Sequence, residues 1–581
     1  MLKNYQKTMK NLFDYKWYYL STGLVFQLVF GVVAKWGLKR LFTLMLLLTG
    51  QENLSNANFS QVLANPLGTI TLLFYVIALT ACLYLEYAGF CLMIASTMVK
   101  KQVSWRLALG LKWSQLPKLV PNGCYFLLYM ILTVPLANLG LSTSLTKALY
   151  IPEFITGEWS KSTTSTLGLV LLGIILCYLT FRLLYVIPLF VLGQYDFPKV
   201  LLISWKQTKG KMLSLILQFT LVEASLMLLL LPIYLLLLML ALWLDTVGTH
   251  LMIEGLLLTA VNSCLFVLNL FLKIGMLHVL VGQISIDWER LSLKPLKFKW
   301  MSYQWLLLGV TFLGLWLQES QQLKVLQYHP SIQIVGHRGY VKKAVENSLQ
   351  GLRAAKRYQA NAVEADVLYT RDHQFVVIHD DHLKRLAGKN QQVSEMSASD
   401  VCNLKLKQGE YHSQIVSLDS FLAEAERLKM NVILELKPTG KEDSQYVPSF
   451  IQLLAQKGLS IQIKVMSLDL ETIRQVERLA PQLETGYVIP IQFGNPPKVD
   501  VDFYAIEDFS YHPKLAKTIH EEGKQLYVWT VNAADKVHFY LQSPIDGLIT
   551  DELEIVQTTK KALSEEGGYF DRLIDLVQPI Q

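Results

Sequence analysis

Long apolar runs and short alternating segments divide the chain into two parts. The apolar runs fill the first 320 or so residues, and a membrane-spanning helix needs about 20 predominantly apolar residues. Six runs reach that length, and a seventh, shorter run is flanked by tryptophans, which are enriched at membrane interfaces. In chain order the runs are 17–49, 68–98, 120–142, 165–197, 213–244, 255–283 and 303–318. The pattern predicts a helical membrane domain of about seven spans over residues 1–320.

Basic residues recur in alternate loops between these runs. The N-terminal segment and three loops each carry four or five Lys or Arg, and they alternate with loops that carry none or only two. The basic loops are 99–118, 198–212 and 284–302, and the others are 50–66, 143–163 and 245–254. Basic loops stay cytoplasmic. Seven crossings from a cytoplasmic N-terminus therefore predict a plasma-membrane protein whose C-terminal domain is extracytoplasmic.

The first apolar run, 17–49, follows a basic segment, as the apolar core of a secretory signal does. No small-residue cleavage site follows it, so we interpret it as a first membrane anchor. Lys35, Lys39 and Arg40 interrupt the run, which is long enough for one span plus an interfacial helix. Two spans here would break the charge alternation of every later loop, and a single span is therefore preferred.

Several ionisable residues fall inside the predicted spans. Such residues are costly in lipid and usually face the interior of a helix bundle. One interpretation is a polar cavity for a lipid head group, and the other is a set of side-chain pairs that hold helices together. The residues are Glu86, Arg182, Glu223, Lys273 and His278.

From about residue 333 short strand-like and helix-like segments alternate. Nine strands are predicted, and helical stretches separate most of them. The strands are Ile332–Gly336, Ala362–Leu368, Gln374–His379, Val432–Leu436, Gln462–Ser467, Thr485–Ile489, Phe503–Ile506, Gln525–Val531 and Gly547–Thr550. This alternation favours an α/β TIM barrel, (β/α)8, over 333–560, with a doubly wound open sheet as the alternative. A short linker, 321–332, and a C-terminal helical tail, 561–581, complete the chain.

Composition and charge narrow the possible partners. The chain is 52% hydrophobic and 17% charged, an average of two unlike halves, and its formal net charge is +7. The bases cluster in short loops between apolar runs and form no stripe with aromatics, so a nucleic-acid partner is not expected. Cys402 is the lone cysteine of the C-terminal part and cannot form a bridge within it. The cysteines therefore indicate no particular redox compartment.

Three acidic residues lie at the ends of neighbouring predicted barrel strands, which suggests a metal site. Glu364 and Asp366 are two positions apart on one predicted strand, so both side chains point to the same face. Glu435 ends a neighbouring strand. Three converging carboxylates provide oxygen ligands for a hard divalent ion, Mg²⁺ or Ca²⁺, and would repel one another without it.

Further polar residues end the same strands, where the active sites of barrel enzymes are built. Arg338 and Lys437 supply positive charge suited to a phosphate group. His337 and His379 titrate near neutrality, which suits one acid and one base. Each motif alone is weak, since a histidine after an apolar strand is often only a structural residue. The ordered set at successive strand ends is a stronger signal.

This ordered set resembles the glycerophosphodiester phosphodiesterases. The motifs are GHRG at 336–339, ENS at 346–348, EADV at 364–367, VVIHDD at 376–381, ELKP at 435–438, WTVN at 529–532 and DGLITD at 546–551. The resemblance covers about 333–560, and the multi-span half resembles the membrane domain found upstream in some members, without a sharp motif. The motif ENS has Ser348 where the family more usually has threonine, and this substitution keeps the side-chain hydroxyl.

The resemblance implies a role for each matching residue. Glu364, Asp366 and Glu435 would bind the metal, His337 and His379 would form the acid–base pair, and Arg338 and Lys437 would hold the phosphate. Asn347, Trp529 and Asn532 would line the substrate pocket. The implied reaction is metal-dependent hydrolysis through a cyclic phosphate, which forms when the substrate's own glycerol hydroxyl attacks phosphorus.

Several questions stay open at this level. His382 lies close to His379, which is preferred because it directly ends its strand. A catalytically weak sensing barrel and an accessory domain of a transporter are the alternatives to a hydrolase. The intact set of site residues disfavours the first, and the absence of a clear internal repeat disfavours the second. The substrate could be a lipid head group, a lysophospholipid or a polyglycerophosphate polymer, with membrane lipids as further partners.

Overall fold

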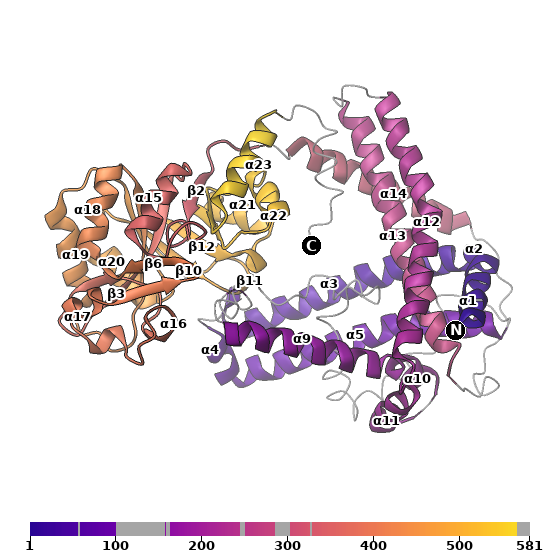
Figure 1. Ribbon diagram of the computed structural model, residues 1–581. Coiled ribbons are helices and arrows are strands. Elements are labelled where there is room, and N and C mark those ends of the chain that lie inside the picture. The colour runs from indigo at the N-terminus through magenta and orange to yellow at the C-terminus, as the bar shows by residue number, and fades with distance from the viewer. Residues whose placement is uncertain are drawn as a thin grey trace.

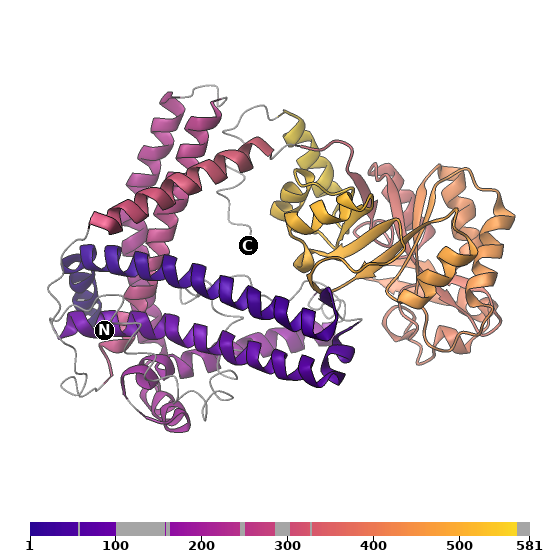
Figure 2. The same cartoon turned by 180° about the vertical axis from the view of Figure 1, so that it is seen from behind.

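The computed structural model describes residues 1–55, 58–99, 157, 163–193, 195–244, 250–284, 302–325 and 328–565. A helical N-terminal half lies beside an α/β barrel (Figure 1; Figure 2 shows the reverse side). The predicted span 120–142 lies outside the described residues, as do most of the loops around it.

Five of the described helices are long and apolar enough to cross a membrane. They are Lys16–Thr49, Pro66–Met98, Ser165–Leu192, Met212–Leu240 and Leu251–Val281. These five helices correspond to five of the predicted runs, including a single helix for the interrupted run 17–49. The predicted run 303–318 falls in α14 (Ser302–Val325), which is not among the five. The predicted linker 321–332 thus begins with residues that are still helical.

The helical half comprises the following described elements. They are α1 (Leu2–Asp14), α2 (Lys16–Tyr18), the π-helical turn η1 (Tyr19–Gly23), α3 (Leu24–Thr49), β1 (Asn53–Ser55), α4 (Phe59–Ala64), α5 (Pro66–Met98), α9 (Thr163–Leu183), α10 (Val186–Leu192), α11 (Phe197–Gln207), α12 (Met212–Leu244), α13 (Leu251–Val281) and α14. Helices α3 and α5 form a long hairpin, and α12 and α13 pack against each other (Figure 1).

Sequence signals explain the ends of the α3–α5 hairpin. Helix α3 ends at Gly50, whose φ of 67° is the left-handed conformation that suits glycine. Helix α5 begins at Pro66 after Asn65, whose side chain accepts hydrogen bonds from the first backbone N–H groups. The helix from Lys16 to Thr49 has 34 residues. At 1.5 Å per residue it is about 50 Å long and exceeds the roughly 30 Å hydrocarbon layer.

Polar side chains inside the helical half pair with one another. The Lys273 ammonium lies 2.9 Å from a carboxylate oxygen of Glu86, and both side chains are almost fully buried between α13 and α5. His278 bonds to the hydroxyl of Thr8 at 3.0 Å, and Arg182 donates to the carbonyl of Trp205. These contacts favour the interpretation that such residues hold helices together.

Eight parallel strands close into the predicted barrel. They are β2 (Gln333–Gly336), β3 (Ala362–Tyr369), β8 (Asn431–Leu436), β9 (Ile463–Ser467), β10 (Glu484–Ile489), β12 (Phe503–Glu507), β13 (Gln525–Trp529) and β14 (Gly547–Thr550). Strand β2 pairs with both β14 and β3, which closes the ring and excludes the open-sheet alternative. Apolar residues on both faces of these strands are buried, as expected for a parallel sheet covered by helices.

Helices follow most strands and pack around the barrel. They are α15 (Leu349–Arg357), α18 (Leu418–Leu428), α19 (Tyr446–Lys457), α20 (Leu470–Leu479), α21 (Pro513–Glu521), α22 (Ala534–Leu541) and α23 (Leu553–Glu565). Smaller elements lie in the connections: β4 (Phe375–Val377), α16 (Lys384–Ala387), η5 (Val393–Glu395), α17 (Ala398–Cys402), β5 (Lys405–Gln408), β6 (Tyr411–Gln414), β7 (Val416–Ser417), β11 (Gln492–Gly494) and η6 (Asp508–Ser510).

One predicted strand is not a barrel strand. The segment Gln374–His379 contains β4, which runs antiparallel to β3 and not parallel to it. The reason is the length of β3, whose last residues extend to Tyr369 before a short turn returns the chain alongside it. The amide of Ile378 donates to the carbonyl of Asp366 at 3.0 Å, so the returning chain brings His379 back to the level of the carboxylates.

The two halves of the chain meet through strand pairing. Strand β1 lies in the loop between α3 and α5, and it pairs antiparallel with β11 of the barrel. Glu52 forms an ion pair with Lys498 at 2.6 Å, and the ring of Phe42 lies edge-on to Phe493 with centroids 6.5 Å apart. The long α3–α5 hairpin thus carries the barrel at its tip (Figure 2).

Candidate active site

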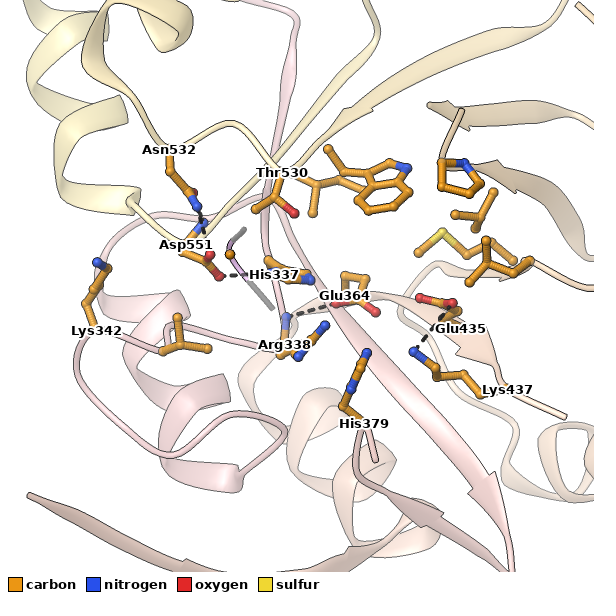
Figure 3. A pocket seen from close by; sticks show the side chains of 18 of the residues that line it. His337, Arg338, Lys342, Glu364, His379, Glu435, Lys437, Thr530, Asn532 and Asp551 are labelled. Atoms are coloured by element: carbon orange, nitrogen blue, oxygen red, sulfur yellow. Dashed lines mark hydrogen bonds and ion pairs between the residues drawn. The ribbon is translucent and has the colours of Figure 1, made fainter. Parts of the chain in front are cut away.

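A cavity of about 820 Å³ opens at the carboxyl ends of the barrel strands. Its walls include charged residues from β2, β3 and β8 and apolar residues from β9, β10, β13 and β14. The lining residues predicted from the sequence are His337, Arg338, Glu364, His379, Glu435, Lys437, Trp529 and Asn532. Figure 3 shows His337, Arg338, His379 and Lys437 gathered around Glu364 and Glu435.

Three carboxylates converge beside this cavity. Glu364 and Asp366 alternate along β3, and Asp366 lies directly across from Glu435 in the pairing of β3 with β8. One oxygen from each carboxylate can be chosen so that all three lie within 4.8 Å of one another. All three residues are buried. The spacing and the oxygen chemistry match the ligand set of a hard divalent cation.

The electrostatics of the carboxylates agree with a cation site. Burial, together with the negative charges of Asp366 and Glu435, raises the pKa of Glu364 well above its usual value. Burial also opposes ionisation of Asp366, but Lys437, His379 and Arg338 lower the pKa of Asp366 well below its usual value. One oxygen of Glu364, Oε1, is buried without a hydrogen-bond partner in the described structure. A buried carboxylate oxygen of this kind fits a metal ligand.

Two cations flank the carboxylates. The backbone N–H of Arg338 donates to Glu364 at 2.9 Å, and the Arg338 guanidinium lies 3.3 Å from Asp366. The Lys437 ammonium lies 3.2 Å from Asp366 and 3.9 Å from Glu435. Burial opposes the charge of Lys437, yet these two carboxylates raise its pKa overall. Both cations line the cavity, where they can also meet a phosphate group.

Each predicted catalytic histidine is oriented by its own carboxylate. Nδ1 of His337 lies 2.8 Å from Asp551, and Nδ1 of His379 lies 2.6 Å from Asp380. An ionised carboxylate only accepts hydrogen bonds, so each Nδ1–H donates to its partner. Nε2 of each ring is then the nitrogen available for proton transfer.

The two orienting carboxylates stay ionised. Both are partly desolvated, but hydrogen bonds and charge from neighbouring groups lower the pKa of Asp551 and of Asp380. For Asp551 these groups are His337, Asn532 and Arg338, and the Asn532 amide donates to Asp551 at 2.9 Å. For Asp380 they are His379 and Arg385, and Arg385 also pairs with buried Glu346.

Of the three predicted pocket residues, two line the cavity and the third does not. Trp529 and Asn532 line the cavity, and Asn532 also holds Asp551. Asn347 is buried and is not among the lining residues described. Its amide donates to Asp366 at 2.8 Å, and its carbonyl accepts from the Asp366 backbone. Asn347 is therefore placed to fix the orientation of a carboxylate.

The structure also distinguishes the neighbouring histidines. His379 faces the cavity, whereas His382 is exposed and does not line it. Sequence reasoning did not identify Asp551, Asp380, Glu346 or Arg385 as site residues. Asp551 follows β14 and ends the DGLITD motif, so the strand-end rule could have included it. Glu346 begins the ENS motif but follows no strand, and Arg385 lies outside the motifs, so the strand-end rule finds neither.

We expect Asp551→Asn to lower kcat about 10- to 100-fold, because the loss of a carboxylate partner leaves His337 without its orienting acceptor. Asp551 is ionised over the whole assay range, so the effect should be present at every pH tested. The measurement is kcat against pH on a soluble glycerophosphodiester. Glu554→Gln is the matched control, since Glu554 is exposed, lies three residues along and pairs with exposed Lys343, and neither residue is among those described as lining the cavity. Equal losses in the two variants would contradict the assignment.

Comparison with known proteins relates both halves of the chain to one family. Residues 1–315 match the family described as the membrane domain of glycerophosphoryl diester phosphodiesterase, and residues 337–555 match the glycerophosphoryl diester phosphodiesterase family. A glycerophosphodiester phosphodiesterase of Caldanaerobacter subterraneus is 23% identical over 238 residues, which is 38% of this chain and 94% of the relative. One of Arabidopsis thaliana is 22% identical over 255 residues, 41% of this chain and 76% of the relative.

Solved structures resemble the barrel half. A phosphodiesterase of Oleispira antarctica, solved with the product sn-glycerol-3-phosphate, is 21% identical with a TM-score of 0.37 and covers 39% of this chain and 96% of its own. A glycerophosphodiester phosphodiesterase of Agrobacterium tumefaciens is 19% identical with a TM-score of 0.35 and covers 39% and 99%. With the membrane-domain match covering more than half of its length, the chain belongs to the glycerophosphoryl diester phosphodiesterase family and is a phosphodiesterase of its membrane-bound kind.

Proposed function

We propose that this membrane-bound phosphodiesterase hydrolyses glycerophosphodiesters to a glycerol phosphate and an alcohol, in a reaction that depends on a divalent cation and takes place at the outer surface of the plasma membrane. The observation that carries this proposal is the convergence of three carboxylates, two cations and two carboxylate-held histidines on one cavity. A catalytically weak sensing barrel would have no use for the complete set.

Glu364, Asp366 and Glu435 are the residues that would hold the cation. When bound, a divalent cation neutralises charge on the phosphoryl oxygens and lowers the pKa of a nearby hydroxyl. The protein's own contribution is to fix the ligands. The Arg338 backbone N–H holds Glu364, and the Asn347 side chain holds Asp366. Mg²⁺ and Ca²⁺ both suit a set of oxygen ligands, and titration of activity with each ion distinguishes them.

The two histidines suit a two-step proton transfer. In the first step one Nε2 takes the proton of the substrate's glycerol hydroxyl, which attacks phosphorus, while the other histidine protonates the departing alcohol oxygen. A cyclic phosphate results. In the second step water opens the ring with the two proton transfers reversed. Arg338 and Lys437 offset the negative charge of the phosphate in both steps.

The experiment for this chemistry uses a substrate and an analogue. ³¹P NMR of the full-length enzyme with glycerophosphocholine should show a transient cyclic phosphate before glycerol phosphate. A diester that lacks the adjacent glycerol hydroxyl should not react, because the internal nucleophile is missing. Hydrolysis of this analogue at a comparable rate would contradict internal attack and indicate direct attack by water.

The outer-surface location rests on the pairing of β1 with β11. The loop 50–66 contains β1 and has no Lys or Arg, so the charge rule assigns it to the extracytoplasmic side. Its pairing with the barrel supports the same side for the catalytic domain.

We expect a protease to remove a C-terminal tag from intact cells, because the barrel is outside. An N-terminal tag on the same protein is the control and should be cut only after the membrane is permeabilised. The measurement is immunoblotting of both tags over a protease time course. A C-terminal tag that is protected until permeabilisation would assign the barrel to the cytoplasm and overturn the proposed location.

A further inference from the structure

The wall of the catalytic cavity is not built by the barrel alone. Leu169 of α9 lines it together with His337, Glu364 and His379, as does Gly157, which also precedes the barrel in the chain. Helix α9 belongs to the membrane half and contains most of the span Ser165–Leu192. The opening of the catalytic cavity, which we call the barrel mouth, therefore faces a membrane helix.

A built interface holds the barrel in this orientation. Strand β1 pairs with β11 over three residues on each side, with Leu54 opposite Phe493. The fit is close at Gly494, where a side-chain carbon would lie 3.0 Å from the carbonyl oxygen of Glu52 and where φ is 101°. Only glycine adopts this conformation readily. Main-chain pairing, the Glu52–Lys498 ion pair and the Phe42–Phe493 contact together orient the barrel mouth.

The cavity has a charged region and an apolar region. The charged residues come from the ends of β2, β3 and β8 and surround the carboxylate cluster. The apolar residues come largely from β9, β10 and β13, and they are Met466, Leu468, Val488, Pro490 and Trp529. Leu468 is 39% exposed although it is a large apolar side chain. A diester of two small polar groups would leave this apolar region unused.

Helix α9 extends the apolar region towards the bilayer. Leu169 is the fifth residue of the span, so it lies within about 6 Å of the start of the span at 1.5 Å per residue. On the face of α9 that carries Leu169, the next apolar side chains are Leu172, which is 43% exposed, and Leu176, which is partly exposed. An alkyl chain that leaves the cavity past Leu169 would meet this surface within one or two helical turns.

We infer that α9 is part of the substrate site, and that the site accepts a glycerophosphodiester that still carries a hydrocarbon chain, a substrate of the lysophospholipid class. The inference rests on the proposed hydrolysis and adds to it the substrate class and the element that selects it. The diester lies at the carboxylates and histidines, and the chain passes Leu169 towards the bilayer. The membrane half thus contributes to specificity and does more than anchor the barrel.

The first test compares two substrates in the full-length enzyme reconstituted in vesicles. Leu169→Gln should lower kcat/KM for lysophosphatidylcholine about tenfold, because it removes an apolar contact with the chain. It should leave kcat/KM for glycerophosphocholine within about twofold. Leu171→Gln is the control, since two positions along a helix turn the side chain about 200° away. This variant should match wild type on both substrates.

The possible outcomes separate the inference from the function it rests on. An equal loss on both substrates, or no loss on lysophosphatidylcholine, would overturn the role of α9. A wild-type enzyme that hydrolyses glycerophosphocholine but not lysophosphatidylcholine would overturn the substrate class and leave the proposed reaction intact. A wild-type enzyme that hydrolyses neither would contradict the proposed reaction itself.

A second test examines the orientation of the barrel directly. In a cysteine-free background, Leu54→Cys with Phe493→Cys places two thiols opposite each other on paired strands, within reach of a disulfide. Leu54→Cys with Gln492→Cys is the control, because adjacent strand residues point to opposite faces. Mild oxidation should link the first pair and not the second, as mapped by mass spectrometry. No link in the first pair, or equal links in both, would overturn the orientation.

Discussion

Replacement of any one carboxylate of the cluster by its amide is expected to lower kcat at least about 10³-fold. A divalent cation stabilises developing charge on the phosphoryl oxygens by several kcal/mol, and each 1.4 kcal/mol corresponds to a tenfold change in rate. Glu364→Gln keeps the shape of the side chain and removes one charged ligand. An excess of chelator should abolish the activity of wild type, and Mg²⁺ or Ca²⁺ should restore it.

Thermal unfolding of the barrel provides a readout independent of activity. In wild type, burial first and then the negative charges of Asp366 and Glu435 raise the pKa of Glu364, so a bound cation would relieve both the desolvation and the repulsion. Added divalent cation should therefore raise the Tm of wild type, and Glu364→Gln should reduce or remove that rise. Glu521→Gln is the control, because Glu521 is exposed at the end of α21 and pairs with Lys517, and neither residue is among those described as lining the cavity. Full activity of wild type in chelator would rule out the cation site.

Substitution of either proposed catalytic histidine is expected to have the second-largest effect. His337→Ala and His379→Ala should each lower kcat about 10²- to 10⁴-fold, since each removes one proton-transfer group. Wild type should show a bell-shaped dependence of kcat/KM on pH. The pKa values of Asp380 and Asp551 are held below the usual range, so both stay ionised and the two limbs report the histidines.

His382→Ala is the control for this prediction. His382 is exposed and does not line the cavity, so its replacement should leave kcat within about twofold of wild type. Circular dichroism of each variant checks that the barrel remains folded. A larger loss in His382→Ala than in His379→Ala would show that the wrong histidine has been assigned.

The barrel and most of its site follow from local sequence patterns. Each of the eight barrel strands is an apolar segment of four to eight residues, and the polar residues that follow the strands meet at one end of the ring. The side-chain period of two is sufficient to bring Glu364 and Asp366 together on β3. The strand-end rule predicts the place of His379 for an incomplete reason, since β4 is an antiparallel return of β3 and not a barrel strand.

Other features depend on contacts that no local pattern encodes. Glu346 and Arg385 meet because two loops fold over the barrel, and Arg385 then reaches Asp380. Strand β1 is three residues long, and its partner β11 lies more than 400 residues away in the chain. In the sequence, Leu169 is one of many apolar residues in a predicted membrane span. Its place in the cavity wall depends on how the two halves are oriented.

The most direct test of the proposed reaction is product analysis with purified full-length enzyme and glycerophosphocholine, with and without divalent cation. The proposed function predicts glycerol phosphate and choline in equal amounts when Mg²⁺ or Ca²⁺ is present. In excess chelator, and in Glu364→Gln with cation, neither product should form above the uncatalysed rate. Turnover that is unaffected by chelator, or no turnover of wild type with either cation, would contradict metal-dependent hydrolysis at this site.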